Sequence, residues 1–103
     1  MTITKKAEGA SVTLAVEGRL DTVTSPELEA ELNASFAGTE ELTLDFAGLE
    51  YISSAGLRVL LMAQKKMNAQ GKMRVINVGE TVGEVFDITG FSDILTVERT
   101  ESV

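Results

Sequence analysis

The 103-residue chain contains no cysteine, no histidine and no tryptophan, and Pro26 is its only proline. Without cysteine it can form no disulfide, no thiolate nucleophile and no zinc–thiolate site. Without histidine it also lacks the usual general base of serine hydrolases and the commonest transition-metal ligand. We therefore expect a protein that is not an enzyme and that needs no cofactor and no metal.

Long hydrophobic runs are absent as well. The longest apolar run, Ala55–Ala63, is interrupted by Arg58 and is far shorter than the roughly 20 residues that a membrane-spanning helix needs. The basic start of the chain, Met1–Lys6, is followed by no apolar segment and so does not resemble a signal peptide. We expect a cytoplasmic protein with no membrane partner.

Basic residues are few in the first half of the chain. The net charge is −7, and residues 1–50 hold ten acidic residues against three basic ones, whereas residues 51–103 hold six of each. Binding to nucleic acid normally requires a basic surface, so we do not expect a nucleic acid partner. The length and a hydrophobic content of 44% are ordinary for one globular domain, which we assign to residues 1–103.

Hydrophobic periodicity predicts alternating strands and helices. Strands are expected at about residues 3–6, 11–17, 42–46, 51–52, 72–78 and 95–98, and helices at about residues 25–37, 54–68 and 80–89. The first two strands are expected to form a hairpin around Glu8-Gly9. This order predicts an α/β sandwich, with a mixed four- to five-stranded sheet, an N-terminal hairpin and about three helices packed on it.

The start of the first predicted helix fits two capping arrangements. Thr24 could cap it with Glu27 completing a capping box, or Ser25 could cap it with Pro26 at the first helical position. The apolar residues of this helix recur every four positions and are predicted to face the core: Leu28, Leu32 and Phe36.

Two serines mark the most informative stretch of the chain, because Ser53 and Ser54 stand between an apolar strand end and an amphipathic helix. A serine oxygen at that position can accept a hydrogen bond from an unpaired amide of the first helical turn. The same free amides and the positive end of the helix dipole also favour a phosphate group. From the residues alone, helix capping is the commoner of these two roles.

The other candidate catalytic and ligand-binding motifs in the sequence are weaker than this serine pair. Asp21, Asp45 and Glu50 could in principle supply an acid–base pair, but their spacing does not bring two of them together, and solvated loop acids are favoured. Gly79–Gly83 follows a strand and opens a helix, yet it lacks the Lys-Ser/Thr ending of a phosphate loop and the glycine spacing of a dinucleotide site. We interpret it as a turn.

Basic residues cluster around the end of the second predicted helix and the start of the next strand: Lys65, Lys66, Lys72 and Arg74. No aromatic residues are interleaved with them, and the negative end of the helix dipole accounts for the two helical lysines. A solvated helix end is therefore preferred to a binding patch.

The segment Ser53-Ser54-Ala55-Gly56-Leu57 resembles the signature of the STAS domain, which is found in anti-sigma factor antagonists and in the cytoplasmic tails of sulfate transporters. Three other segments follow in the family's order: Gly-Arg-Leu-Asp-Thr at 18–22, Leu-Thr-Leu-Asp-Phe at 42–46 and Phe-Asp-Ile-Thr-Gly-Phe at 86–91. The resemblance covers nearly the whole chain and implies a STAS-like sandwich.

The resemblance also implies a site. In stand-alone members, an anti-sigma factor with serine kinase activity phosphorylates the serine two positions before the Gly-Leu pair, which is Ser54 here. The preceding residue is often aspartate in the family and is Ser53 in this chain, so Ser53 is the second candidate. An aspartate near the phosphorylation loop corresponds to Asp21. The implied partner-binding residues are Asp21, Thr22, Ser53, Ser54, Ala55, Gly56 and Arg58.

Two functions fit the sequence. The resemblance implies an anti-sigma factor antagonist that binds the anti-sigma factor kinase when unphosphorylated and is released on phosphorylation, which regulates transcription by partner switching. The kinase would supply ATP and Mg²⁺, a serine phosphatase would reset the switch, and a monomer suits such an exchange. The alternative is a STAS interaction module of a transporter complex or signalling assembly, in which the serines are caps and are not phosphorylated.

Overall fold

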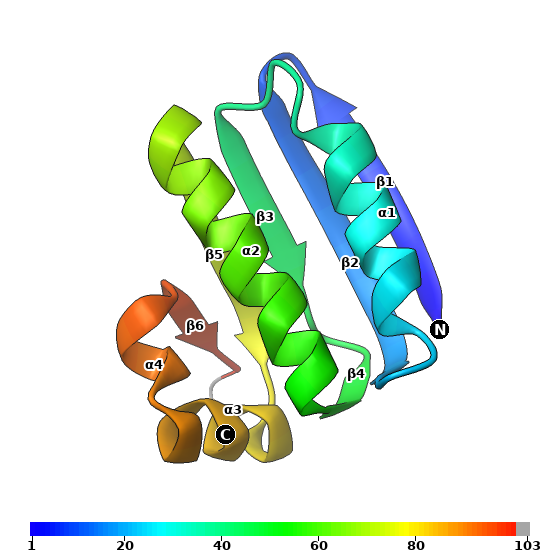
Figure 1. Cartoon of the computed structure of the whole chain (residues 1–103), viewed down its shortest axis with the longest axis vertical. Helices are drawn as coiled ribbons and strands as arrows, with labels where there is room; N and C mark the ends of the chain where they lie inside the picture. The colour runs from blue at the N-terminus through cyan, green and yellow to red at the C-terminus, as the bar shows by residue number, and fades with distance from the viewer. Residues whose placement is uncertain (101–103) are drawn as a thin grey trace.

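The computed structural model describes residues 1–100 and shows strands alternating with helices, as the sequence predicts (Figure 1). In chain order the elements are β1 (Thr2–Glu8), β2 (Ser11–Leu20), α1 (Ser25–Ser35), β3 (Glu41–Asp45), β4 (Leu49–Ile52), α2 (Ser54–Gln70), β5 (Lys72–Val78), α3 (Glu80–Thr89), α4 (Phe91–Ile94) and β6 (Val97–Arg99). Six strands and four helices are thus present in the described residues, whereas a sheet of four to five strands and about three helices was expected.

The strands form one mixed sheet in the order β1-β2-β3-β5-β6. The hairpin of β1 and β2 is antiparallel, and every other pairing is parallel. The ten-residue β2 has two successive partners on one side: its residues 11–15 pair with β3, and its residues 18–20 pair with β4. The short β4 therefore continues the sheet beyond the end of β3.

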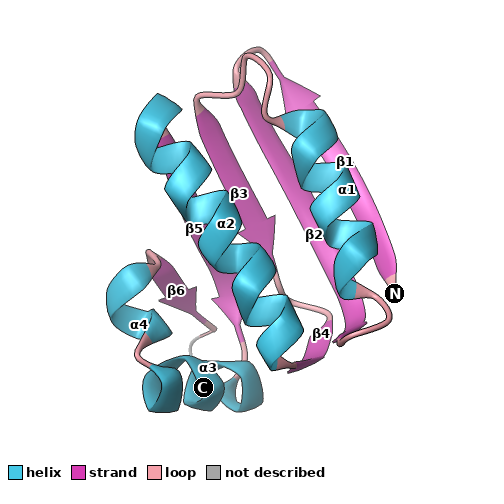
Figure 2. Ribbon diagram, viewed as in Figure 1, coloured by secondary structure: helices cyan, strands magenta, loops and turns pink. Residues whose placement is uncertain are grey.

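Helices α1 and α2 cover one face of the sheet and run in the same direction along it (Figure 2). Alternation along β2 explains this arrangement, because Val12, Leu14 and Val16 are buried under the helices while Glu17 on the opposite face is exposed. Each fully buried leucine or valine of this layer contributes roughly 1.5–3 kcal/mol. The predicted inner face of α1 is confirmed, since Leu28, Leu32 and Phe36 are all buried.

Helix α2 is longer than predicted and ends at Gln70, before Gly71. Lys65 and Lys66 therefore lie outside its last turn, and the interpretation that they complement the negative end of the helix dipole is wrong. The predicted helix end at Gly90 is confirmed: this glycine has φ 82° and ψ 3°, the left-handed conformation typical of a helix C-terminus. Within residues 1–100, no helix combines the length and the apolar character needed to cross a membrane.

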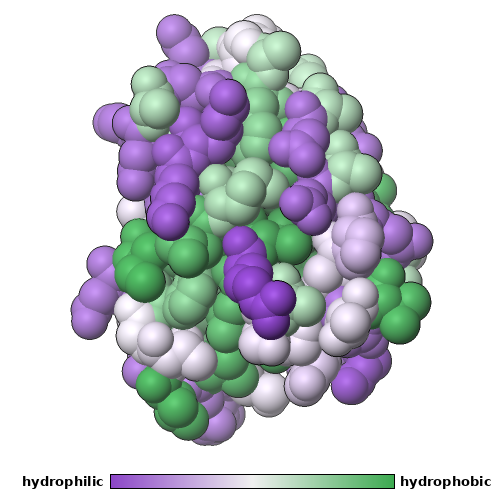
Figure 3. All heavy atoms as spheres, viewed as in Figure 1, coloured by the Kyte–Doolittle hydropathy of each residue, from purple (hydrophilic) through white to green (hydrophobic). Residues whose placement is uncertain are grey.

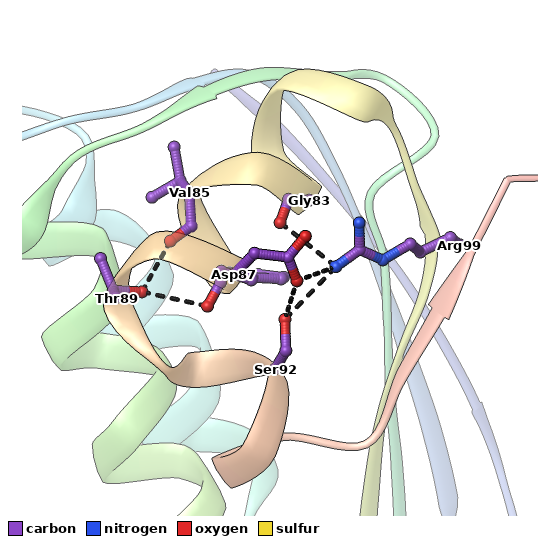
Figure 4. Close-up of polar contacts among 7 residues, drawn as sticks. Gly83, Val85, Asp87, Thr89, Ser92 and Arg99 are labelled. Atoms are coloured by element: carbon purple, nitrogen blue, oxygen red, sulfur yellow. Dashed lines mark hydrogen bonds and ion pairs between the residues drawn. The ribbon is translucent and has the colours of Figure 1, made fainter.

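The C-terminal part of the described chain differs most from the prediction. The short helix α4 was not expected, and the last strand is β6 at Val97–Arg99 instead of residues 95–98. The bounds of β6 follow from its pairing with β5, in which Val97 lies opposite Val75 and Arg99 opposite Val78. Arg99 also contacts the two preceding helices (Figure 4). Its guanidinium donates to the Gly83 carbonyl at 3.3 Å, pairs with the Asp87 carboxylate and lies 3.3 Å from the Ser92 hydroxyl, so it joins β6 to both α3 and α4.

The contacts of Asp87 predict a pH dependence of stability. The Ser92 hydroxyl, which donates to Asp87 at 2.6 Å, and the Arg99 guanidinium lower the pKa of this carboxyl below its ordinary value of 3.8. Because the folded state favours the carboxylate, the stabilisation is present above pH 3.8 and is lost as the pH falls through the lowered pKa.

We expect Asp87→Asn to lower the melting temperature at pH 7, and this difference from wild type to shrink below pH 3. Thermal unfolding followed by circular dichroism at both pH values measures it, with the exposed Asp93→Asn as a control that changes little at either pH. An equal loss for Asp87→Asn at both pH values would contradict the assignment.

Gly71 joins α2 to β5 where the backbone of another loop passes very close. A β-carbon added at Gly71 would lie 1.9 Å from the Glu40 carbonyl oxygen, whereas one added at Gly79 would have no neighbour within 4 Å. We expect Gly71→Ala to destabilise the protein by more than about 2 kcal/mol and Gly79→Ala by less than about 1 kcal/mol. Chemical denaturation of both variants tests this, and similar losses would contradict it.

Candidate functional site

The candidate site lies where β2 and β4 end side by side. Leu20 and Ile52 are register partners in this parallel pair, and the Ser53 N–H donates to the Leu20 carbonyl at 2.9 Å. The residues that follow the two strands, Asp21 and Ser53, are therefore held together, although they are far apart in the sequence. This places the loop before α1 next to the start of α2.

The two serines at the start of α2 have different environments. Ser53 is half-buried with an extended backbone (φ −97°, ψ 175°), and its hydroxyl oxygen accepts from the Gly56 N–H at 3.4 Å. Ser53 is thus the N-cap residue. Ser54 is the first residue of the helix; its side chain is exposed and makes no hydrogen bond to any other residue between 1 and 100.

Gly56 allows α2 to start very close to the sheet. A β-carbon at this position would lie 2.8 Å from the Ile52 side chain and 2.9 Å from the Leu20 side chain. The first turn of α2 is therefore fixed against the ends of both strands that carry the site. Gly56 itself is buried, Ala55 is half-buried and Arg58 is exposed, so the predicted partner-binding residues differ in how far a partner can reach them.

Asp21 organises the loop that precedes α1. Its carboxylate accepts from the backbone N–H groups of Val23 and Thr24, both at 3.0 Å. The Thr24 N–H, followed by the Val23 N–H, lowers the pKa of Asp21, with partial desolvation acting in the opposite direction. Held in this way, the loop leaves Thr22 exposed and leaves 82% of the Val23 side chain accessible.

Neither predicted cap of α1 is found. The Thr24 side chain makes no cap hydrogen bond and instead donates to the Arg19 carbonyl at 2.6 Å. The Ser25 hydroxyl donates to the Asp21 carbonyl, and Pro26 is accommodated in the first turn. The side-chain caps fail because the Thr24 and Ser25 hydroxyls both bond carbonyls of the preceding loop. The Glu27 N–H, which a cap would approach, donates instead to the Thr24 backbone carbonyl at 2.9 Å.

A groove between α1 and α2 opens beside the two serines. It has a volume of about 290 Å³, and its lining includes Thr22, Ala55 and Arg58. Three of the predicted partner-binding residues thus border one depression. The Arg58 side chain has no ion-pair partner among residues 1–100.

The other candidate acids do not combine into a site. Asp45 accepts from the Ala47 N–H and from the Asn77 side-chain amide, both at 3.0 Å, and Glu50 is exposed on β4. In the part of the chain that the structure describes, no three acidic side chains come together as a metal site would require. Gly79 precedes α3 as its N-cap residue, in agreement with the turn interpretation.

The basic residues around the end of α2 lie on different surfaces. Lys72 and Arg74 border a depression along β3 and β5, where Arg74 pairs with Glu98 at 3.2 Å. Lys66 borders a separate hollow between α1 and α2. They therefore do not act together as one patch.

One feature of this end of the sheet had no signal in the sequence. The Arg19 guanidinium lies over the Tyr51 ring, 4.2 Å from its centroid. The two residues are register partners in β2 and β4, and only knowledge of that pairing could have brought them together. The contact is a cation–π interaction that adds to the attachment of β4.

The chain is similar in sequence to proteins named as anti-sigma factor antagonists. The chain is 39% identical over 84 residues to BtrV of Bordetella bronchiseptica, a proposed anti-sigma factor antagonist; this covers 80% of the chain and 72% of BtrV. It is 37% identical over 86 residues to the anti-sigma-B factor antagonist of Staphylococcus epidermidis, covering 82% of the chain and 80% of that protein.

Solved structures show the same fold. The structure of the Bacillus cell fate determinant SpoIIAA in its phosphorylated form matches with a TM-score of 0.76 at 16% identity, over 98% of this chain and 93% of SpoIIAA. The unphosphorylated form of SpoIIAA, an anti-sigma factor antagonist, matches with a TM-score of 0.83 at 17% identity, over 98% and 90%.

The family model of the STAS domain matches residues 2–103, which is nearly the whole chain. Together with relatives that are more than a third identical, this agrees with the resemblance carried by the segment from Ser53 to Leu57. The chain belongs to the STAS domain family.

Proposed function

We propose that this protein is an anti-sigma factor antagonist whose binding to an anti-sigma factor with serine kinase activity is controlled by phosphorylation of Ser54. The observation that carries the proposal is the division of roles at the start of α2, where Ser53 caps the helix and the Ser54 hydroxyl is exposed and unpaired within residues 1–100. The names of the similar proteins, anti-sigma factor antagonists, support the kind of partner.

The reaction at Ser54 needs little from this chain. The γ-phosphoryl group of ATP moves to the Ser54 oxygen, the hydroxyl proton passes to a base of the kinase, and ADP leaves. ATP, Mg²⁺ and the transfer machinery belong to the kinase. This protein presents a hydroxyl on a fixed helix start, so it is a substrate and a binding partner instead of a catalyst, and a serine phosphatase returns it to its first state.

The fold tolerates the modification. A phosphate carries about −1.5 to −2 charges at neutral pH. At the N-terminus of α2 the helix dipole stabilises a negative charge by roughly 0.3–1 kcal/mol. Phosphorylation therefore does not unfold the protein, and its effect falls on the interface with the partner.

Phosphorylation of Ser54 would lower the free energy of binding at the interface with the anti-sigma factor. A new dianion placed against acidic groups of the partner costs several kcal/mol. A loss of about 3 kcal/mol weakens binding on the order of a hundredfold, which is enough to separate a complex. The unphosphorylated protein stays bound and the phosphorylated one leaves, most simply as a monomer in the cytoplasm.

The position of the phosphate is the first test. When the protein is incubated with its anti-sigma factor kinase, ATP and Mg²⁺, we expect phosphate on Ser54, none after Ser54→Ala, and retained phosphorylation after Ser53→Ala. The Ser53→Ala variant should also lose about 0.5–2 kcal/mol of folding free energy, because the helix loses its cap. Mass spectrometry maps the phosphate, and its absence from both serines would instead favour an interaction module without a switch.

Binding without phosphorylation tests the switch itself. We expect Ser54→Ala to bind the anti-sigma factor like wild type and Ser54→Asp to bind at least about tenfold more weakly, since only aspartate brings a charge. Calorimetric titration gives the dissociation constants. The matched control is Ser53→Asp, for which we expect unchanged folding stability in a denaturation experiment, because aspartate caps a helix as well as serine does. Equal binding by wild type and Ser54→Asp would contradict the proposal.

Asp21 is expected to act through the loop that it holds. Removing its carboxylate by Asp21→Ala frees the Val23 and Thr24 amides, so we expect a severalfold loss of affinity for the anti-sigma factor while Ser54 is still phosphorylated. The control is Glu50→Ala, which removes an exposed carboxylate from β4 and should leave the affinity unchanged. Equal affinities for both variants would show that the loop makes no contact.

A further inference from the structure

Arg58 follows Ser54 by one turn of α2. The two residues are four positions apart, so their side chains lie on the same face of the helix, about 6 Å apart along its axis. Both are exposed, and Arg58 forms no ion pair with any residue from 1 to 100. Side chains of a helix lean toward its N-terminus, so the long Arg58 side chain extends toward the turn that carries Ser54.

The surface around Arg58 contains little that competes for its charge. Arg58 borders the depression of about 290 Å³ beside the serines, and Glu29 of α1 is the one carboxylate among the described residues that line it. Glu29 and Arg58 form no ion pair. Figure 3 views the face covered by α1 and α2 and shows an isolated, strongly hydrophilic area near its centre, surrounded by apolar and weakly polar surface. An anion added to Ser54 would therefore meet a cation that is not yet engaged.

Arg19 is a second cation near this end of the sheet, but it faces away from α2. Its guanidinium lies over the Tyr51 ring, 4.2 Å from the centroid. Alternation along β2 places it on the opposite face of the sheet from Leu20, which is buried under the helices. The lysines of α2 are about three turns away from Ser54. Arg58 is therefore the cation best placed to reach a group attached to the Ser54 oxygen.

We propose that Arg58 holds the phosphate of phosphorylated Ser54, so that the modification also withdraws this cation from the surface that a partner meets. The inference rests on the proposed function for the event that attaches the phosphate. The planar guanidinium donates two parallel N–H bonds to phosphate oxygens, which an ammonium group does less well. An anion four residues before a cation is also the more favourable order on a helix.

The pairing changes the surface of α2 at two residues at once. Before phosphorylation, the helix start offers a neutral hydroxyl and a free guanidinium. Afterwards the guanidinium of Arg58 is engaged, and the phosphate leaves a net negative charge. A partner that contacts Arg58 thus loses its cation and meets an anion in the same step. Phosphorylation therefore alters binding more than a charge placed where it could not reach Arg58.

The test attaches the phosphate without the kinase, by incorporating phosphoserine at position 54 during synthesis of the full chain. The ³¹P resonance of the phosphate is then titrated with pH. Because the guanidinium favours the dianion, we expect the titration midpoint to lie about 0.5 pH unit lower in wild type than in Arg58→Gln. Arg58→Lys keeps the charge and should retain most of this difference. Phosphoserine should also raise the melting temperature of wild type more than that of Arg58→Gln.

The matched control is Arg19→Gln, which removes a cation from the other face of the sheet at the same end and should leave the midpoint within about 0.1 pH unit of wild type. Equal midpoints in wild type and Arg58→Gln would overturn the pairing, and so would a midpoint that only Arg19→Gln changes. Because no kinase takes part, either result leaves the proposed function intact. Failure of the kinase to modify Ser54 would instead overturn the proposed function. Circular dichroism confirms that all variants are folded.

Discussion

The parallel pairing of β4 with the end of β2 is the contact on which the site depends. β2 is long enough to pair first with β3 and then with β4, and this brings Leu20 beside Ile52. The hydrogen bond from the Ser53 N–H to the Leu20 carbonyl completes the pairing. Without it, the Asp21 loop and the start of α2 would be unrelated surfaces, and no partner could contact both at once.

The same pairing explains how a modification can act without disturbing the fold. Gly56 fixes the first turn of α2 against the strand ends, and Ser53 supplies the cap, so nothing in the packing requires the Ser54 hydroxyl. A charge added to the exposed Ser54 side chain is solvated in the free protein and loses that solvation only when a partner covers it. Its electrostatic cost is therefore transferred to whatever lies against it, which is the condition that a binding switch requires.

The sequence predicted most of the fold because the patterns involved are local. The alternation of buried and exposed residues in β2 and the helix end at Gly90 depend on neighbouring residues alone. The start of α2 is likewise local, because the Ser53 side chain caps the helix that follows it. The prediction from sequence failed where contacts with other parts of the chain determine the local structure. The bounds of β6 depend on its pairing with β5, and α1 lacks a side-chain cap because the Thr24 hydroxyl bonds the Arg19 carbonyl outside the helix.

Existing ion pairs distinguish the start of α2 from two other parts of the surface. On the sheet, Arg74 already has Glu98 as its partner, and around α3 the Arg99 guanidinium is held by Asp87. A protein binding over either pair would have to compete with an existing contact. Arg58, in the second turn of α2, has no such partner within residues 1–100, so a carboxylate docking there would gain an interaction without breaking one. Ser54 and Arg58 are four residues apart on α2 and so share one helix face. A partner docking over that face would therefore be sensitive to a charge on either residue.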